Sequence, residues 1–134
     1  MAADRCIKTL VIMNSGLINE GSKAVPSANL PKARLNDIHT PTFHILGGES
    51  DRAYEHGMDG FARITHVPVV VGSLLGVGHG GTQWQLNGGK AAAAVVAWLN
   101  WQLRGDMRSA KLFVGKDCGL CVDPAWRLRK KGVD

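Results

Sequence analysis

The sequence contains no apolar run long enough to cross a membrane, since a spanning helix needs about 20 consecutive apolar residues. Its first apolar run, Leu10–Met13, is short and has no cleavage site of the kind that follows a signal peptide, so we predict no signal peptide. There is no internal repeat, and the alanine run 91–94 is the one segment of low complexity. At 134 residues, the chain is therefore expected to form a single domain, 1–134, without a membrane segment.

Cysteine is also scarce. The chain has three, two of which form CGLC at 118–121. A zinc site needs more ligands, and the sequence has no second C-x-x-C and no H-x-x-x-H, so we predict no metal. The motif is also far from the N-terminal position that is typical of thioredoxin-like redox sites. Cys118 and Cys121 are therefore interpreted as a structural disulfide or as two unreactive thiols.

Charged residues make up 20% of the chain, and the net charge is +5. The basic residues are scattered until the run RLRKK at 127–131, which has no interleaved aromatic residues. Nucleic-acid-binding surfaces combine clustered basic residues with aromatic ones. We therefore predict that this run is a solvated C-terminal tail and that the protein does not bind nucleic acid.

Three short apolar segments, rich in branched or aromatic side chains and followed by turn residues, predict strands at 8–13, 42–46 and 67–71. Their apolar residues are continuous rather than alternating, which indicates strands that are covered on both faces, as in a parallel sheet. Helical spacing of apolar residues predicts helices at 30–37, 51–64 and 90–103. The alternating order predicts an α/β fold with about three parallel strands and flanking helices.

In such sheets, functional residues gather at the carboxyl ends of the strands. The third strand runs into GVGHGG at 76–81, which has the G-x-G-x-x-G spacing of a dinucleotide-binding loop. That loop also requires a helix that begins within the motif and an acid after the next strand. Here the helix begins near Gly88–Lys90, and the acid at a suitable distance, Asp106, follows a helix. We therefore predict no nucleotide cofactor.

The histidine in this loop, His79, is the better candidate for chemistry. Glycines on both sides allow sharp turns and close approach of a substrate. An acid at the end of the preceding strand, Asp51 or Glu49, would accept the imidazole N–H and fix the tautomer of a general base. An ordinary loop histidine remains the alternative. The other histidines, at 39, 44, 56 and 66, are interpreted as structural or solvent-facing.

Five longer stretches resemble the C-terminal part of α/β-hydrolases, most closely a secreted bacterial and fungal group of esterase-like enzymes. They are VIMNSGL (11–17), HILGGESDRAYEHGMDGFARI (44–64), HVPVVVGSLLGVGHGGT (66–82), AWLNWQLRGD (97–106) and LFVGKDCGLCVDPAW (112–126). The resemblance implies a truncated α/β-hydrolase-like three-layer sandwich. By position, Asp51 matches the catalytic acid and His79 the general base. The resemblance also implies a disulfide between Cys118 and Cys121, and secretion.

The nucleophile elbow of that family, G-x-S-x-G, is absent from the sequence. Two serines close to predicted strand ends could replace it, namely Ser73 as the first choice and Ser15 as the second. The backbone N–H groups of Gly78, Gly80 and Gly81 are the predicted oxyanion donors.

Together these features predict a carboxylic ester hydrolase that acts on small esters, aromatic ones included, by serine/histidine acyl transfer. The alternative is a catalytically incomplete fragment, acting as a binding or assembly module or as half of a split enzyme. Because the first strand would lack its inner neighbour, we expect a homo-oligomer formed through that edge and through exposed apolar helix faces.

Overall fold

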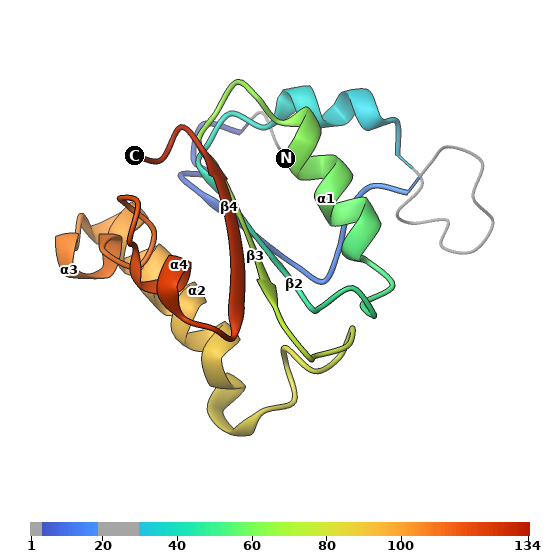
Figure 1. Cartoon of the computed structure of the whole chain (residues 1–134). Coiled ribbons are helices and arrows are strands. Elements are labelled where there is room, and N and C mark those ends of the chain that lie inside the picture. The colour runs from blue at the N-terminus through green and yellow to red at the C-terminus, as the bar shows by residue number, and fades with distance from the viewer. Residues whose placement is uncertain (1–3, 19–29) are drawn as a thin grey trace.

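The computed structural model of the protein describes residues 4–18 and 30–134 (Figure 1). At its centre is a four-stranded sheet with the strand order β1-β2-β3-β4. The first three strands are parallel, and the fourth is antiparallel to the third. The strands are β1 (Leu10–Met13), β2 (Thr42–Leu46), β3 (Val69–Leu74) and β4 (Trp126–Lys131). The protein is therefore of the α/β class, with a mixed sheet.

Helices cover both faces of the sheet, which lies between α1 and α2 in Figure 1. One face carries the 3-10 helix η2 (Lys32–Asp37) and helix α1 (Tyr54–Arg63). The other carries α2 (Gly89–Arg104), which follows the short 3-10 helix η3 (Leu86–Gly88). Two short helices, α3 (Met107–Ala110) and α4 (Gly119–Val122), lead from α2 to β4.

Strand β2 shows why both faces are covered, because all five of its residues are buried. Successive side chains of a strand point to opposite faces. Phe43 packs in the core against Trp98 of α2 and against Phe113, with ring centroids 5.3 and 5.2 Å apart. On the opposite face, α1 comes very close to the sheet, since a Cβ atom added at Gly57 would lie 2.6 Å from Leu46.

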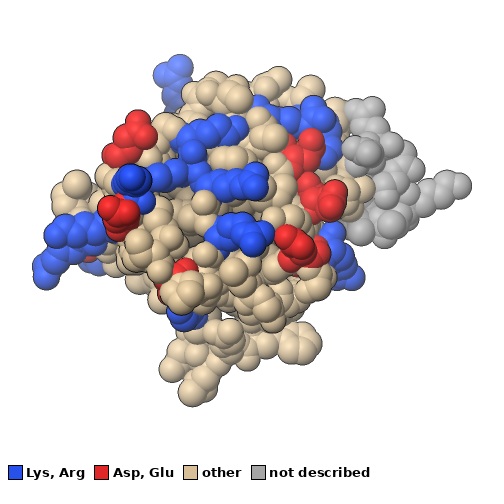
Figure 2. Space-filling view, viewed as in Figure 1, with Lys and Arg blue, Asp and Glu red and all other residues tan. Residues whose placement is uncertain are grey.

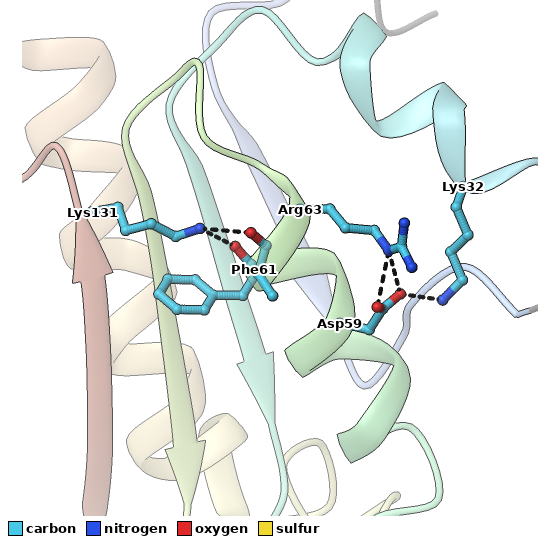
Figure 3. Close-up of polar contacts among 6 residues, drawn as sticks. Lys32, Asp59, Phe61, Arg63 and Lys131 are labelled. Carbon is cyan, nitrogen blue, oxygen red and sulfur yellow. Dashed lines mark hydrogen bonds and ion pairs between the residues drawn. The ribbon is translucent and has the colours of Figure 1, made fainter.

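The basic run at 127–131 is part of β4, so the prediction of a solvated tail is wrong. Lys131 donates hydrogen bonds to the carbonyls of Phe61, Ala62 (3.1 Å) and Ile64 (2.8 Å), and its ammonium lies 4.5 Å from the Phe61 ring centroid (Figure 3). A cation at the C-terminus of a helix satisfies free carbonyls and interacts favourably with the helix dipole. Lys131 therefore anchors the C-terminal end of α1. Figure 2 shows several Lys and Arg side chains on the viewed face of the molecule, with Asp and Glu side chains among them.

The same close-up shows a second attachment of α1. Asp59 accepts hydrogen bonds from Lys32 of η2 and from Arg63 one turn along its own helix (2.9 Å) (Figure 3). The Lys32–Asp59 pair holds α1 against η2, and Lys131 holds the end of α1 against β4.

The three predicted strands are present and parallel, and the second has the predicted bounds, 42–46. The first begins at Leu10 rather than at Lys8, and the third continues through Ser73 to Leu74. The fourth strand was missed, because its apolar residues are separated by Arg and Lys that pair with backbone carbonyls or with Glu49.

Candidate active site

The loops that follow β1, β2 and β3 meet at one edge of the sheet, and they bring together Asn14, Asp51 and His79. The carboxylate of Asp51 lies 2.7 Å from Nδ1 of His79. The Asp51 side chain is completely buried, whereas 35% of the His79 side chain is exposed. A buried acid thus holds one nitrogen of an imidazole whose ring reaches the surface.

Three further donors fix the Asp51 carboxylate. One oxygen accepts hydrogen bonds from the Gly47 N–H (2.8 Å) and the Asn14 amide (2.8 Å), and the other accepts one from the Ala53 N–H (2.9 Å). Burial raises the pKa of Asp51, but the hydrogen bonds from Ala53, Gly47, His79 and Asn14 outweigh it, so the pKa lies below its usual value. Asp51 is therefore ionised at neutral pH.

The ionised carboxylate determines the tautomer of His79. A carboxylate only accepts hydrogen bonds, so Nδ1 of His79 must carry the proton that lies between them. In neutral imidazole the other nitrogen is then an acceptor. Nε2 of His79 is therefore the nitrogen that can take a proton, as a general base requires.

Asn14 and Thr82 extend this network, and sequence reasoning missed both. Asn14 is 8% exposed, and its φ of 44° places it in the left-handed region, which asparagine tolerates better than most residues. The buried hydroxyl of Thr82 donates to the Asn14 side-chain oxygen, which leaves the Asn14 amide nitrogen to donate to Asp51. The signal for Asn14 was its place in Asn14-Ser15-Gly16, directly after a strand.

Gly47 allows the two loops to touch. A Cβ atom at this position would lie 2.5 Å from the Val77 carbonyl oxygen and 3.0 Å from that of Gly78. The Val77 carbonyl also accepts a hydrogen bond from the Gly48 N–H (2.7 Å). The glycines after β2 therefore let the histidine-bearing loop lie directly on the acid-bearing loop.

The structure corrects the assignment of Ser73 as nucleophile. Ser73 lies inside β3, is 3% exposed, and donates its hydroxyl proton to the Gly47 carbonyl (2.6 Å). Its side chain faces α1 and lines a small cavity with Tyr54 and Met58. A buried hydroxyl that is bonded to a backbone carbonyl is not available to His79 or to a substrate.

Ser15 is in a different situation. It follows Asn14 at the carboxyl end of β1, and it is exposed. Its neighbour Asn14 hydrogen-bonds to Asp51, so Ser15 lies on the same edge of the sheet as the Asp51–His79 pair. Of the two predicted serines, Ser15 is therefore the one compatible with a reaction at His79.

Of the three predicted oxyanion donors, one is already engaged in a hydrogen bond within the protein. The Gly81 N–H donates to the Gly78 carbonyl (3.0 Å) and closes a turn, so it is not free to bind an oxyanion. Within the described ranges, no protein group accepts a hydrogen bond from the N–H of Gly78 or of Gly80. These two groups, on either side of His79, remain as the predicted donors.

The other predicted residues lie outside this site. Glu49, the alternative acid, is 78% exposed and pairs with Arg127 (3.3 Å). Cys118 and Cys121 form a disulfide at the start of α4. Over residues 4–18 and 30–134, no group of three or more His, Cys, Asp or Glu side chains could hold a metal ion, and no helix is long and apolar enough to span a membrane.

Comparison with known proteins adds no assignment. No protein-family model matches the sequence, and no curated protein is similar enough in sequence to be matched to it.

Proposed function

We propose that this protein is a carboxylic ester hydrolase of α/β-hydrolase type, in which Asp51 and His79 form the acid–base pair. The observation that carries the proposal is the 2.7 Å contact between buried, ionised Asp51 and Nδ1 of the partly exposed His79. A carboxylate that orients a histidine in this way is the part that acyl-transfer enzymes of unrelated folds share. The parallel strands β1 to β3, covered by helices on both faces, are compatible with that descent.

Ser15 is the nucleophile in this proposal. Nε2 of His79 removes the hydroxyl proton as Ser15 Oγ attacks the ester carbonyl carbon. The same proton then passes to the leaving alkoxide oxygen, so that the alcohol departs and an acyl-serine remains. A water molecule, deprotonated by Nε2, then attacks the acyl carbon; the bond to Ser15 Oγ breaks, the proton passes from Nε2 to Oγ, and the carboxylic acid is released. The N–H groups of Gly78 and Gly80 would stabilise the oxyanion of each tetrahedral intermediate.

The test is hydrolysis of p-nitrophenyl acetate by the purified protein. We expect turnover by the wild type and loss of at least about 100-fold in kcat for His79→Ala, since a positioned base typically contributes that much or more. His56→Ala is the matched control, because free imidazole also cleaves activated esters and His56 forms no ion pair with a carboxylate among the described residues. Equal rates for the wild type and both variants would contradict the proposal.

The nucleophile is tested separately with a fluorophosphonate, which phosphonylates a serine that is activated by a histidine. We expect peptide mass spectrometry to find the label on Ser15, and neither Ser15→Ala nor His79→Ala to be labelled. Ser73→Ala should be labelled like the wild type, because the Ser73 hydroxyl is buried and bonded to Gly47.

The position of β1 at an edge of the described sheet favours a second candidate, in which another chain supplies the nucleophile. Strand β1 is one of the two outer strands, and its four residues are partly buried. A strand added parallel to β1 would end beside Asn14, which contacts Asp51. This arrangement predicts that the chain alone is inactive, that it takes no fluorophosphonate label, and that activity appears on mixing with a chain that carries G-x-S-x-G.

A further inference from the structure

The histidine-bearing loop presents an exposed tryptophan beside the proposed base. Trp84 is 86% exposed, and Leu86, two residues further on, is 89% exposed. By contrast, Trp98 and Trp126 are buried, and Trp101 packs against Trp98 with ring centroids 5.3 Å apart. The exposure of Trp84 is therefore specific to this loop, and burying such a ring against a partner is strongly favourable.

The indole of Trp84 lies close to Gly80, the residue that follows His79 in the sequence. A Cβ atom added at Gly80, the residue after His79, would lie 3.3 to 3.6 Å from three indole atoms, so the ring lies where a side chain at position 80 would project. The turn that leads to it is closed by the Gln83 N–H, which donates to the Gly80 carbonyl (3.1 Å). The indole thus lies near Gly80, which follows the proposed base in the sequence. Most of the indole surface is exposed to solvent.

The surroundings of the ring are uncharged. The segment 75–89 contains no Asp, Glu, Lys or Arg, and the lower end of the molecule, where this loop lies in Figure 1, is tan in Figure 2. A charged substrate group would find no partner on this loop. A flat apolar group would find the indole and, beside it in the sequence, Leu86.

We propose that Trp84 binds the aromatic ring of an aryl ester, and thus determines the class of substrate that is presented to His79. This inference rests on the proposed ester hydrolase function. Stacked or edge-on aromatic pairs are stabilising beyond the area that they bury. Trp84 touches no reacting atom, so its contribution belongs to binding and is expected in KM rather than in kcat.

The kinetic test compares phenyl acetate with ethyl acetate, using titration of the released acid to follow both. For Trp84→Ala we expect KM for phenyl acetate to rise about tenfold, with kcat unchanged and with ethyl acetate affected less than twofold. Trp84→Phe keeps a ring and should restore most of the preference. Val122→Ala, which trims another exposed apolar side chain on α4, is the matched control and should change neither substrate. Equal effects of Trp84→Ala on both esters would overturn the inference.

A binding measurement separates this inference from the hydrolase proposal. Acetanilide is an amide analogue of phenyl acetate, and N-methylacetamide has the same amide without the ring. We expect acetanilide to shift the indole N–H resonance of Trp84, assigned by its loss in Trp84→Phe, and N-methylacetamide to leave it in place. If neither ester is hydrolysed but acetanilide shifts this resonance, the hydrolase proposal fails and the aromatic site stands. If acetanilide leaves the resonance unchanged, the aromatic site is wrong, whether or not the protein hydrolyses esters.

Discussion

Replacing His44 by leucine should remove most of the sensitivity of this protein to mildly acidic pH. His44 lies in β2 on the face that is covered by α1, and it is 1% exposed. Its neighbours in the sheet are Ile12 and Val71, and Gly60 of α1 lies against its ring. Neither ring nitrogen has a hydrogen-bond partner among the described residues. A proton on this ring would therefore be buried without compensation.

The magnitude follows from the pKa of His44, which burial lowers from 6.5 to about 4. The folded protein thus keeps His44 neutral, while the unfolded chain binds a proton as the pH falls below 6.5. The resulting loss of stability begins near pH 6.5 and continues down to about pH 4, where it reaches about 3 kcal/mol at 1.36 kcal/mol per pKa unit. Roughly 2 kcal/mol of this should be lost between pH 7 and pH 5.

The assay is urea unfolding at pH 7 and at pH 5, followed by circular dichroism, on the wild type and on His44→Leu. At pH 7 the free energy of unfolding of the variant should exceed that of the wild type by about 1 kcal/mol, because the variant removes a buried polar ring without partners. At pH 5 the difference should grow to about 3 kcal/mol. Val71→Ala, a cavity variant on the same face, should lose a similar amount at both pH values. If His44→Leu and the wild type lose equal stability between pH 7 and pH 5, the ring is solvated or paired and the reasoning is refuted.

Three further predictions concern the network around Asp51, the anchor of α1 and the free edge of the sheet. Asn14→Ala removes a donor from Asp51 and leaves the Thr82 hydroxyl without its acceptor, so it should lower the free energy of unfolding by about 1–3 kcal/mol and reduce esterase activity; unchanged activity would show that Asn14 does not position the acid. Lys131→Met should lower the free energy of unfolding by about 1–2 kcal/mol through the loss of the carbonyl contacts at the end of α1, and equal stability in urea would contradict this role. We also expect self-association through β1. The N–H groups of Leu10 and Asn14 donate toward β2, so the N–H group of Val11 points away from the sheet, where a second chain could pair with it. Val11→Pro removes this donor and should convert an oligomer to a monomer in light scattering. A wild type that is monomeric at micromolar concentration would refute this expectation.

The fold was predictable where hydrophobic patterns were strong. The three parallel strands are continuous apolar segments, and the long helix α2 has apolar residues at helical spacing, so their types followed from pattern alone. Strand β4 could not be found in this way, because its sequence WRLRKK has two apolar residues among four basic ones and resembles a solvated basic run. Lys131 bonds backbone carbonyls more than 60 residues away, Lys130 bonds the carbonyls of Phe113 and Gly115, and Arg127 pairs with Glu49. Local sequence patterns do not reveal such partners.

At the candidate site, the contact between Asp51 and His79 was predictable, and the network of residues that supports it was not. Asp51 and His79 were selected because each follows a buried strand, and the structure places their side chains in contact. Ser73 was misplaced because the third strand ends three residues later than predicted. Ser73 therefore lies inside the sheet, under α1, and not at the end of the strand. The role of Asn14 depends on its left-handed backbone and on Thr82, 68 residues away, and neither can be inferred from the order of residue types.

The central claim is that buried Asp51 makes His79 a general base. Its most direct test is kcat/KM for p-nitrophenyl acetate in the wild type and in Asp51→Asn. Asparagine keeps the size of the side chain but no longer requires the proton to lie on Nδ1, so the histidine loses both its charge partner and its fixed tautomer. We predict a loss of about 10³–10⁴-fold in kcat/KM, with little change in the far-ultraviolet circular dichroism spectrum. A folded Asp51→Asn protein that keeps wild-type kcat/KM would contradict the account.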